Sequence, residues 1–433
     1  MNDVIIVGGG LAGLAAGAFC ARPGLRVKVL ERAAELGGRA RTDRESGYAF
    51  NQGGHALYVA GACARIVGEL GVSFSGGRSP GKGLLALARG ELHRLPSGLV
   101  SMLGTDLFGF GAKIETARAL AMIARADTTA LRDTTWTEWV ERVASRPEVR
   151  DALGALARLT TYADAPEIAS AGASVAQIRT GIDPGVLYLD GGWQTLVDGL
   201  ARAARQAGVS VVAAAPVTSI TRGRGRSAAC TVVLASGEAL AAHAVVVATG
   251  PATARKLLGV PTLGADLVPC HAACVDLGLS ALPHPERTFA LGIDRPTYFS
   301  VHSSSARLAD AGATIHVMKY LRPGDTHDAR ANERELNEVL DLVQPGWRER
   351  VVARRFLPNL VASNAVVIAG ARRPPPDATS IEGAFVAGDW VGDEGLLADA
   401  ALASAKGAAE RAIAYVTHVR SRAGSTVATM NAS

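Results

Sequence analysis

Cysteine is scarce in this chain and follows no pattern that indicates a disulfide framework. The 433 residues include five cysteines, an odd number at irregular spacing, without the Cys-x-x-Cys pair of a thiol redox site. Cys270, His271 and Cys274 stand close together, but no second pair of ligands follows them. We therefore expect buried, unpaired cysteines there and no metal site.

Long hydrophobic runs are also missing. The nearest approach to the roughly 18 apolar residues of a membrane-spanning helix is Leu99–Phe110, which Asp106 interrupts. The chain begins with a strand-like segment rather than a signal peptide, so we expect a cytoplasmic protein. We expect the apolar side chains of 95–125 to be buried in a substrate domain, with peripheral membrane contact as the alternative.

Charge is nearly balanced, and aromatic residues are few. The formal net charge is +5, and the arginines are scattered without a long basic run, so we expect no nucleic-acid partner. Only 5% of the residues are aromatic, whereas 48% are apolar, which is enough for a large buried core. A length of 433 residues suits two domains.

The most specific feature present is a glycine-rich turn near the N-terminus. Val4–Val7 is an apolar run that predicts a strand buried on both faces. Gly8 then permits a tight turn, Gly10 lets the backbone approach a pyrophosphate, and Gly13 lets the next helix pack closely on the sheet. That helix, expected at about 12–20, directs its free N–H groups at phosphate charge. The segment therefore predicts a nucleotide diphosphate site.

An acidic residue completes this fingerprint. Glu31 follows the expected second strand, Val27–Leu30, where a carboxylate can accept from ribose hydroxyls and disfavours a 2′-phosphate. The site is therefore not expected to bind NADP. Val245–Pro251 resembles a strand and turn rather than a second fingerprint, which disfavours a separate nicotinamide domain. We expect the substrate to be the electron donor.

Nucleotide-domain segments recur at the start, middle and end of the chain. Thr134–Glu138 has the capping residue and early acid of a helix start. The patterns predict helices at 112–124, 136–143, 194–207, 329–343, 345–354 and 398–416, and strands at 209–213, 217–221, 231–234, 244–248 and 384–387. The expected division is a nucleotide-binding domain of 1–85, 187–260 and 356–420, a substrate domain of 86–186 and 261–355, and a disordered tail of 421–433.

Six segments spread along nearly the whole chain resemble one superfamily. Their order and spacing are similar to those of FAD-dependent amine oxidases and phytoene desaturase-like flavoproteins, which include protoporphyrinogen oxidase and hydroxysqualene dehydroxylase. The phytoene desaturase-like branch is the most similar, through 388–392 and 320–325. The six segments are Val7–Leu14, Glu31–Arg41, Asn51–Tyr58, Gly191–Leu196, Val245–Thr249 and Val386–Trp390.

The resemblance implies an FAD cofactor and an α/β fold. The fold would be a Rossmann-like FAD-binding domain, with a parallel sheet and a three-stranded β-meander, interleaved with a mixed α+β substrate domain. The chain departs from carotenoid desaturases at Gly53–His55, where they tend to carry Gly-Pro. It departs from the monoamine oxidases in lacking an aromatic pair in the C-terminal motif, which leaves an aromatic cage for an amine in doubt.

The resemblance also implies which residues contact FAD. Arg39 would pair with a phosphate, and 52–56 would pass the isoalloxazine. Val217 would contact adenine through its main chain, and Gly388–Asp389 would hold the ribityl–phosphate region. The helix beginning near 397 would aim its N-terminus at the flavin O2 edge. The full expected set is Gly8, Gly10, Leu11, Ala12, Gly13, Glu31, Arg32, Gly38, Arg39, Ala40, Gly53, Gly54, His55, Val217, Gly388, Asp389, Leu397 and Ala398.

Three residues are candidates for a role in the reaction. His55 is the first, as a hydrogen-bond donor or proton carrier near the ring, with a structural histidine as the alternative. Tyr58 is the second, although it could simply pack. Lys319 invites comparison with the lysine of the monoamine oxidases, but its surroundings do not fall at the matching strand.

The implied reaction moves a hydride from a substrate C–H or N–H bond to flavin N5. We expect an FAD-dependent dehydrogenase, desaturase or oxidase that acts on an apolar or amphipathic small molecule. An amine or amino-acid oxidase is the main alternative. A flavin-dependent isomerase, a non-redox FAD-binding protein and a monooxygenase fed by external NADPH remain as others. A homodimer is one option for the assembly.

Overall fold

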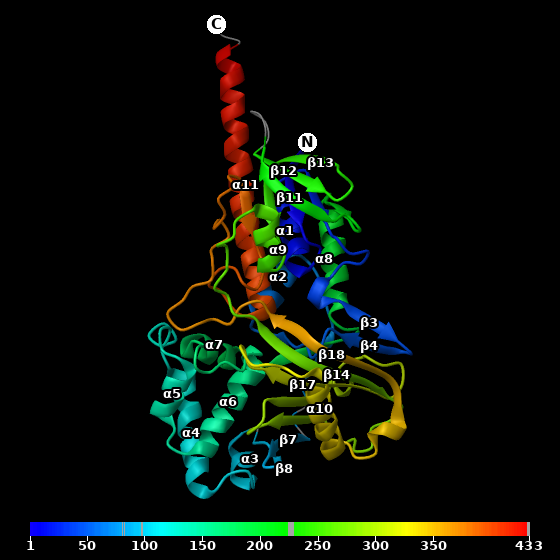
Figure 1. Cartoon of the computed structure of the whole chain (residues 1–433), viewed down its shortest axis with the longest axis vertical. Coiled ribbons are helices and arrows are strands. Elements are labelled where there is room, and N and C mark those ends of the chain that lie inside the picture. Colours follow the sequence, from blue (N-terminus) through cyan, green and yellow to red (C-terminus); the bar gives the residue numbers. More distant parts are fainter. Residues whose placement is uncertain (80, 82, 97, 224–228, 431–433) are drawn as a thin grey trace.

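The computed structural model describes all residues except 80, 82, 97, 224–228 and 431–433 (Figure 1). Two seven-stranded sheets dominate the fold, and each carries its own helices. The sheet that contains the N-terminal strand lies in the upper part of Figure 1, and the second sheet lies below it. Segments distant in sequence meet in both sheets, which confirms the α/β architecture of interleaved parts.

The first sheet is the predicted nucleotide-binding sheet. Its core is parallel, because β1 pairs in parallel with β2 and β13, and β13 pairs in parallel with β19. Antiparallel pairing of β11, β12 and β13 adds the predicted meander. The strands are β10 (Ser210–Val212), β2 (Val27–Leu30), β1 (Asn2–Val7), β13 (Ala239–Val247), β12 (Cys230–Leu234) and β11 (Val217–Arg222) in this order, with β19 (Ala384–Val386) beside β13.

Helices cover both faces of this sheet. Val4 and Ile6 point into one apolar cluster with four helices, whereas Ile5 and Val7 point into another with the fifth. This alternation follows from the period of two in a strand buried on both faces. The first cluster holds α1 (Leu11–Ala21), α2 (Ala62–Glu69), α8 (Gln194–Gln206) and α11 (Leu397–Met430), and the second holds α9 (Pro251–Leu258).

The second sheet is mainly antiparallel and is also covered on both faces. Its strands are β18 (Val351–Ser363), β14 (Cys270–Leu279), β17 (Ala313–Leu321), β16 (Thr297–Val301), β15 (Phe289–Gly292), β7 (Leu84–Ala88) and β8 (Glu91–Arg94) in this order. One face packs on helices of the first insertion and the other on α10. These helices are α3 (Leu99–Gly104), α4 (Phe110–Arg125), α5 (Trp136–Val143), α6 (Pro147–Thr161), α7 (Ala171–Ile182) and α10 (Ala329–Val343).

Short strands connect the two sheets. β3 and β4 form a hairpin, and β9 pairs with both β5 and β6. Single 3-10 turns occur at Gly38–Ala40, His302–Ser304 and Trp347–Arg350. The bounds of the short strands are β3 (Thr42–Glu45), β4 (Tyr48–Asn51), β5 (Leu57–Tyr58), β6 (Gly76–Arg78) and β9 (Val186–Leu189).

The expected start of α5 is confirmed. The Thr135 hydroxyl accepts from the Glu138 N–H at 3.2 Å, and the Glu138 carboxylate accepts from the Thr135 N–H at 2.9 Å. This reciprocal pair satisfies two N–H groups that a helix start leaves without partners.

The predicted helix at 345–354 is wrong. Trp347–Arg350 forms one 3-10 turn, and Val351 then begins β18, which pairs along β14. Pairing with a neighbouring strand overrides a weak local helical pattern. Because β18 runs to Ser363 in the second sheet, it also crosses the expected domain boundary at 355/356.

Two expectations about apolar and terminal segments also need correction. Leu107 and Phe108 are buried, as expected, but the Phe110 residue is 78% exposed at the start of α4. α11 continues to Met430, so 421–430 is helical rather than disordered, and the end of the expected tail, 431–433, lies outside the described residues. Among the described residues, we find no helix that is both long and apolar enough to cross a bilayer.

Candidate active site

A cavity of about 1160 Å³ lies between the two sheets. The ends of β1, β2 and β13 form one side of it, and residues of β17 and β18 form the other. The start of α1 and the start of α11 also line it. A cavity at the carboxyl ends of parallel strands is the usual ligand position in such sheets. Its volume exceeds that of ordinary small-molecule pockets, which suits a dinucleotide and a substrate together.

The glycine-rich turn has the geometry that a diphosphate requires. Gly8 adopts φ +114°, and a Cβ there would lie 2.4 Å from the Ala248 carbonyl oxygen. A Cβ on Gly13 would lie 1.8 Å from the Gly8 oxygen, so only glycine allows this packing of α1. A Cβ on Gly10 would meet nothing closer than 3.6 Å, and Gly10 lines the cavity. The open space beside Gly10 at the N-terminus of α1 therefore fits a phosphate group.

Glu31 stands at the far end of the cavity from the second sheet. Its Oε2 accepts from the Gly9 N–H at 2.6 Å, and its Oε1 accepts from the Ala33 N–H at 2.8 Å. These bonds fix a buried carboxylate that retains acceptor capacity for ribose hydroxyls. Arg32 and Val217 line the same region, so the structure brings the three residues predicted for the adenosine end together.

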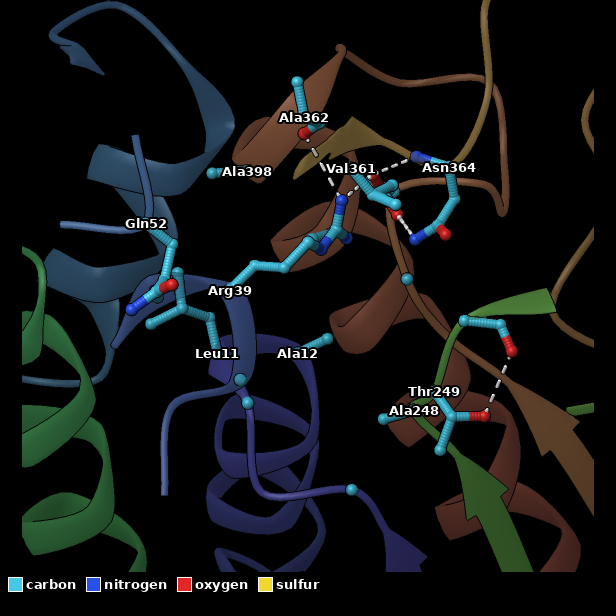
Figure 2. A pocket seen from close by; sticks show the side chains of 18 of the residues that line it. Leu11, Ala12, Arg39, Gln52, Ala248, Thr249, Val361, Ala362, Asn364 and Ala398 are labelled. Atoms are coloured by element: carbon cyan, nitrogen blue, oxygen red, sulfur yellow. Dashed lines mark hydrogen bonds and ion pairs between the residues drawn. The ribbon is translucent and has the colours of Figure 1, made fainter. Parts of the chain in front are cut away.

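Arg39 crosses the middle of the cavity towards a buried acid (Figure 2). Its guanidinium donates to Asp389 Oδ2 at 2.8 Å and to the Ala362 carbonyl at 3.3 Å. Asn364 donates its backbone N–H to Asp389 Oδ2 and its side-chain amide to Oδ1, both at 2.8 Å. Burial alone would raise the pKa of Asp389, but Arg39 and Asn364 lower this pKa to about 2.

The Asp389 carboxylate thus has protein partners on both oxygens. We infer that it orients Arg39, whose side chain is 44% exposed and remains open to a phosphate. Asn364 was missed in the sequence, because a single Asn after a strand carries no recognisable signal. Gly388 and Asp389 both line the cavity, and so do Leu11, Ala12, Gly38 and Ala40.

The opposite end of the cavity carries His55 and Tyr58. His55 Nδ1 lies 3.1 Å from the Gly53 carbonyl, and its ring meets Trp193 edge-on at 5.1 Å. Burial lowers the pKa of His55 to about 4, although the Gly53 carbonyl opposes this shift. The Tyr58 hydroxyl donates to the Thr160 carbonyl at 2.7 Å. Gly54, Tyr162, Met318 and Leu360 complete this end.

Two predicted residues do not reach the cavity. Lys319 points to the opposite face of β17 from Met318, where its Nζ lies 2.5 Å from Glu335 Oε2 on α10. The strand's period of two explains this position and removes Lys319 from the candidates near the ring. Gly53 does not line the cavity either, and a Cβ there would lie 2.8 Å from the Leu360 side chain.

α11 begins beside the cavity in a strained conformation. Leu397 adopts φ +55°, which a side chain other than glycine rarely does. Two residues later, buried Asp399 accepts from the Cys63 N–H at 2.7 Å and so caps α2. Burial raises the pKa of Asp399 to about 6, although the bond from Cys63 opposes this shift.

Asp399 should therefore make the stability of the fold depend on pH. Between the ordinary pKa of about 3.9 and the folded pKa of about 6, the folded chain binds more protons, so stability falls as pH rises. Asp399→Asn removes this ionisation and is expected to stabilise the fold by up to about 3 kcal/mol above pH 6 and by little below pH 4. Urea unfolding at several pH values measures the difference.

Asp198→Asn is the control for this experiment, because Asp198 lies exposed on α8 and accepts from Gln194 one turn away. Its stability difference from the unchanged protein should not vary with pH. A constant difference for Asp399→Asn across the same range would show that Asp399 is ionised at no special cost.

Comparisons with known proteins agree with this geometry. The family model described as flavin containing amine oxidoreductase matches residues 11–273. A double mutant of putrescine oxidase has a similar solved structure, with a TM-score of 0.73 and 17% identity, covering 95% of this chain and 99% of that one. At that identity the likeness shows the fold.

Curated relatives match over shorter segments. Coproporphyrinogen III oxidase from Propionibacterium freudenreichii is 35% identical over 25% of this chain and 21% of its own length. A limonene dehydrogenase from Castellaniella defragrans is 46% identical over 13% of this chain and 10% of its own length. The alignments therefore span about a fifth or less of these relatives. The family model covers more than half of the chain, and the protein belongs to the flavin-containing amine oxidoreductase family as an FAD-dependent oxidoreductase.

Proposed function

We propose that this enzyme removes a hydride from an uncharged, apolar or amphipathic small molecule. When bound, FAD supplies the hydride acceptor at flavin N5. The chain's own residues hold the dinucleotide along the cavity, exclude water from its second-sheet end and present His55 to the substrate. The observation that carries the proposal is the chemical character of that end.

Carboxylates of the cavity are committed elsewhere. Among its described lining residues, the acids are Glu31, Glu35, Asp389 and Asp399. Glu31 and Glu35 belong to the adenosine end, Asp389 is paired with Arg39, and Asp399 caps α2. A protonated amine buried at the His55 end would therefore find no carboxylate partner among these residues, which is costly. Met318, Leu357 and Leu360 offer instead an apolar surface.

His55 is suited to accept a hydrogen bond or a proton. At neutral pH its ring is uncharged, because its pKa lies at about 4. A carbonyl only accepts, so the Gly53 carbonyl assigns the ring proton to Nδ1 and leaves Nε2 as an acceptor. This assignment favours His55 as an acceptor over the donor role that the sequence also allowed.

The names of relatives support two substrate classes. Limonene dehydrogenase acts, by its name, on a hydrocarbon, which agrees with the apolar lining. The family description and the name of putrescine oxidase favour an amine instead. An amine or amino-acid oxidase is therefore the second candidate.

Anaerobic reduction of the bound flavin distinguishes these candidates. The FAD-loaded protein is mixed with matched pairs of compounds, each a neutral lipophilic alkene or alcohol and the amine of the same carbon skeleton. We expect the neutral member to bleach the visible flavin band and the amine to leave it unchanged. Bleaching by the amines alone would replace the proposal with the second candidate, and NADPH-driven bleaching would indicate a monooxygenase.

His55→Ala should retain FAD but slow this reduction. Loss of a general base typically costs 10²–10⁴ in rate, so we expect a fall of roughly a hundredfold or more. Stopped-flow absorbance measures the rate. His271→Ala is the control, because His271 also lines the cavity but pairs with Asn359 at an exposed position. An unchanged rate in His55→Ala would make His55 a structural residue.

The domain division also remains a proposal. We propose the boundaries given by the sequence, with the last one moved beyond Ser363 because β18 belongs to the second sheet. A lipophilic substrate, a homodimer, a cytoplasmic location and the lack of a nucleic-acid partner likewise stay predictions.

A further inference from the structure

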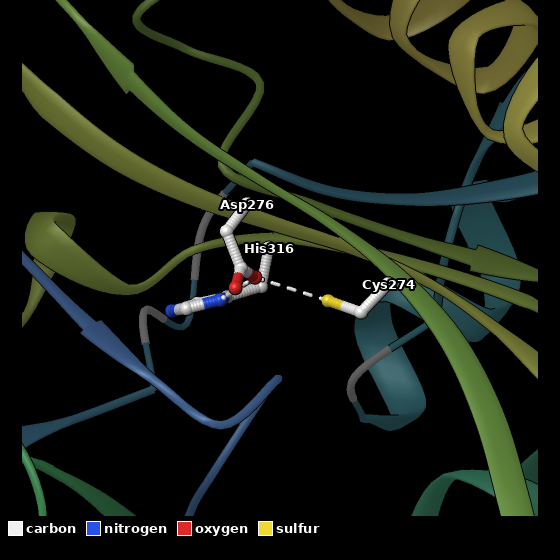
Figure 3. A group of neighbouring side chains, drawn as sticks. All are labelled: Cys274, Asp276 and His316. Carbon is white, nitrogen blue, oxygen red and sulfur yellow. Dashed lines mark hydrogen bonds and ion pairs between the residues drawn. The ribbon is translucent and has the colours of Figure 1, made fainter. Parts of the chain in front are cut away.

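A buried polar cluster lies in the second sheet, on the face towards the cavity side of β14 and β17 (Figure 3). Asp276 Oδ1 lies 2.6 Å from His316 Nδ1 and accepts from the Cys274 thiol at 3.0 Å. Asp276 and His316 are fully buried. Burial alone would raise the pKa of Asp276, but His316 and Arg355 lower it, so the carboxylate is charged.

This cluster has the residue types of a metal site. The three candidate ligand atoms of Cys274, Asp276 and His316 lie within 4.8 Å of one another. However, Arg355 donates to Asp276 Oδ2 through Nε at 3.0 Å and through a terminal nitrogen at 2.6 Å. A guanidinium so close supplies the positive charge that a metal ion would otherwise bring. The cluster is therefore better explained as the anchor of Arg355.

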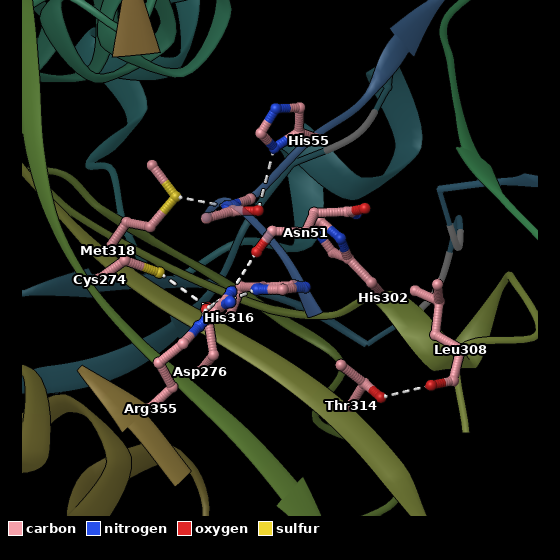
Figure 4. Close-up of polar contacts among 12 residues, drawn as sticks. Asn51, His55, Cys274, Asp276, His302, Leu308, Thr314, His316, Met318 and Arg355 are labelled. Atoms are coloured by element: carbon pink, nitrogen blue, oxygen red, sulfur yellow. Dashed lines mark hydrogen bonds and ion pairs between the residues drawn. The ribbon is translucent and has the colours of Figure 1, made fainter. Parts of the chain in front are cut away.

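Arg355 extends from this anchor to the β3–β4 hairpin. One terminal nitrogen donates to Asp43 Oδ2 at 2.8 Å, and the other donates to the Asn51 carbonyl as well as to Asp276. The guanidinium also lies 5.5 Å from the centre of the Phe50 ring. A single side chain, 18% exposed, thus joins the second sheet to the segment that enters the active site (Figure 4).

The residues after Asn51 are held by the same contacts. Gln52 donates to Asp43 Oδ2 at 2.7 Å, and the Gly53 N–H donates to the Asn51 carbonyl at 2.8 Å. Beyond them, the Gly54 N–H meets Met318 Sδ at 3.2 Å. The two acceptors that Arg355 binds are therefore also the acceptors that fix Gln52 and Gly53, directly before Gly54 and His55.

We propose that Arg355 is a positioning residue for the reaction: anchored on Asp276, its guanidinium fixes the segment Asn51–His55 and so sets the place of His55 beside the flavin. The planar fork of arginine donates in several directions at once, which a lysine ammonium on one flexible stem does not reproduce. The inference rests on the proposed function in placing the flavin ring next to His55.

Arg355→Lys in the FAD-loaded protein tests this inference, with Arg354→Lys as the matched control. Arg354 is the next residue on β18 and pairs instead with Glu333 Oε1, at 2.6 Å. NMR titration of His55 reports its surroundings independently of turnover. We expect its pKa to move from about 4 towards 6.5 in Arg355→Lys, the visible flavin spectrum to shift, and flavin reduction to slow about tenfold or more. Arg354→Lys should change none of these.

Other outcomes decide against the inference. An unchanged His55 titration and flavin spectrum in Arg355→Lys would overturn it, even if thermal stability fell. If this variant does not fold, Asp276→Asn removes the charge of the anchor with little change of shape and should give the same His55 shift. Stoichiometric zinc in the purified protein, lost in His316→Gln, would overturn it in favour of a metal site.

Failure of this inference is distinguishable from failure of the proposed function. If no compound in the panel bleaches the flavin of the unchanged protein, the proposed function fails, but the His55 titration still tests Arg355. If compounds bleach the flavin equally well in Arg355→Lys and in the unchanged protein, the inference fails and the function stands.

Discussion

Gly13→Ala is expected to disrupt the FAD-binding half of the molecule. The new Cβ would lie 1.8 Å from the Gly8 oxygen, which is backbone and cannot rotate away. α1 would have to move off β1, and α1 also packs on α8 and α11. Overpacking a tight site typically costs 1–3 kcal/mol and occasionally more, so we expect a loss of at least about 3 kcal/mol. Urea unfolding and FAD binding should both show it.

Gly10→Ala separates cofactor binding from folding. Gly10 has an ordinary φ of −82°, and its Cβ would meet no described protein atom closer than 3.6 Å. The FAD-free variant should therefore fold normally. Its methyl group would occupy the side from which the diphosphate approaches, so FAD affinity should fall about ten- to a hundredfold. Unchanged FAD affinity in this folded variant would contradict the placement of the diphosphate over α1.

Arg39→Ala should have the second large effect. It removes a charge-assisted contact to phosphate, worth about 1.5–3 kcal/mol, or roughly ten- to a hundredfold in FAD affinity. It also leaves the buried Asp389 charge with Asn364 alone, and removing one partner of a buried pair costs about 3 kcal/mol or more. Equilibrium dialysis measures the affinity and urea unfolding measures the stability.

The double variant Arg39→Ala/Asp389→Asn distinguishes these two losses. Without the Asp389 charge, no buried carboxylate is left unpaired, so stability should recover most of its loss. FAD affinity should stay low, because the phosphate partner is still missing. If Arg39→Ala retained FAD as firmly as the unchanged protein through long dialysis, Arg39 would have only a structural role.

The cofactor site could be predicted from the sequence largely because local conformation determines it. The turn at Gly8–Gly13 and the acid at Glu31 come from one βαβ unit, and the distances between them follow from strand and helix geometry. The start of α5 was predictable for the same reason, since Thr135 and Glu138 act within a single turn.

Contacts between distant segments could not be predicted in this way. Arg39 and Asp389 are 350 positions apart, and Asn364 reaches the pair only because β18 ends there. Lys319 and Met318 are neighbours in sequence, yet the sheet decides which of them faces the cavity. The contacts of Arg355 arise from three strands that meet only in the folded molecule.

Titration of the FAD-free protein with FAD, FMN and riboflavin, followed in the visible band, tests the central claim most directly. The account places the adenosine at Glu31 and the diphosphate between Gly10 and Arg39, so both halves of the dinucleotide are needed. We predict saturation at one FAD per chain and much weaker binding of FMN and riboflavin. A folded protein that takes up no FAD, or that binds FMN as tightly as FAD, would contradict the account.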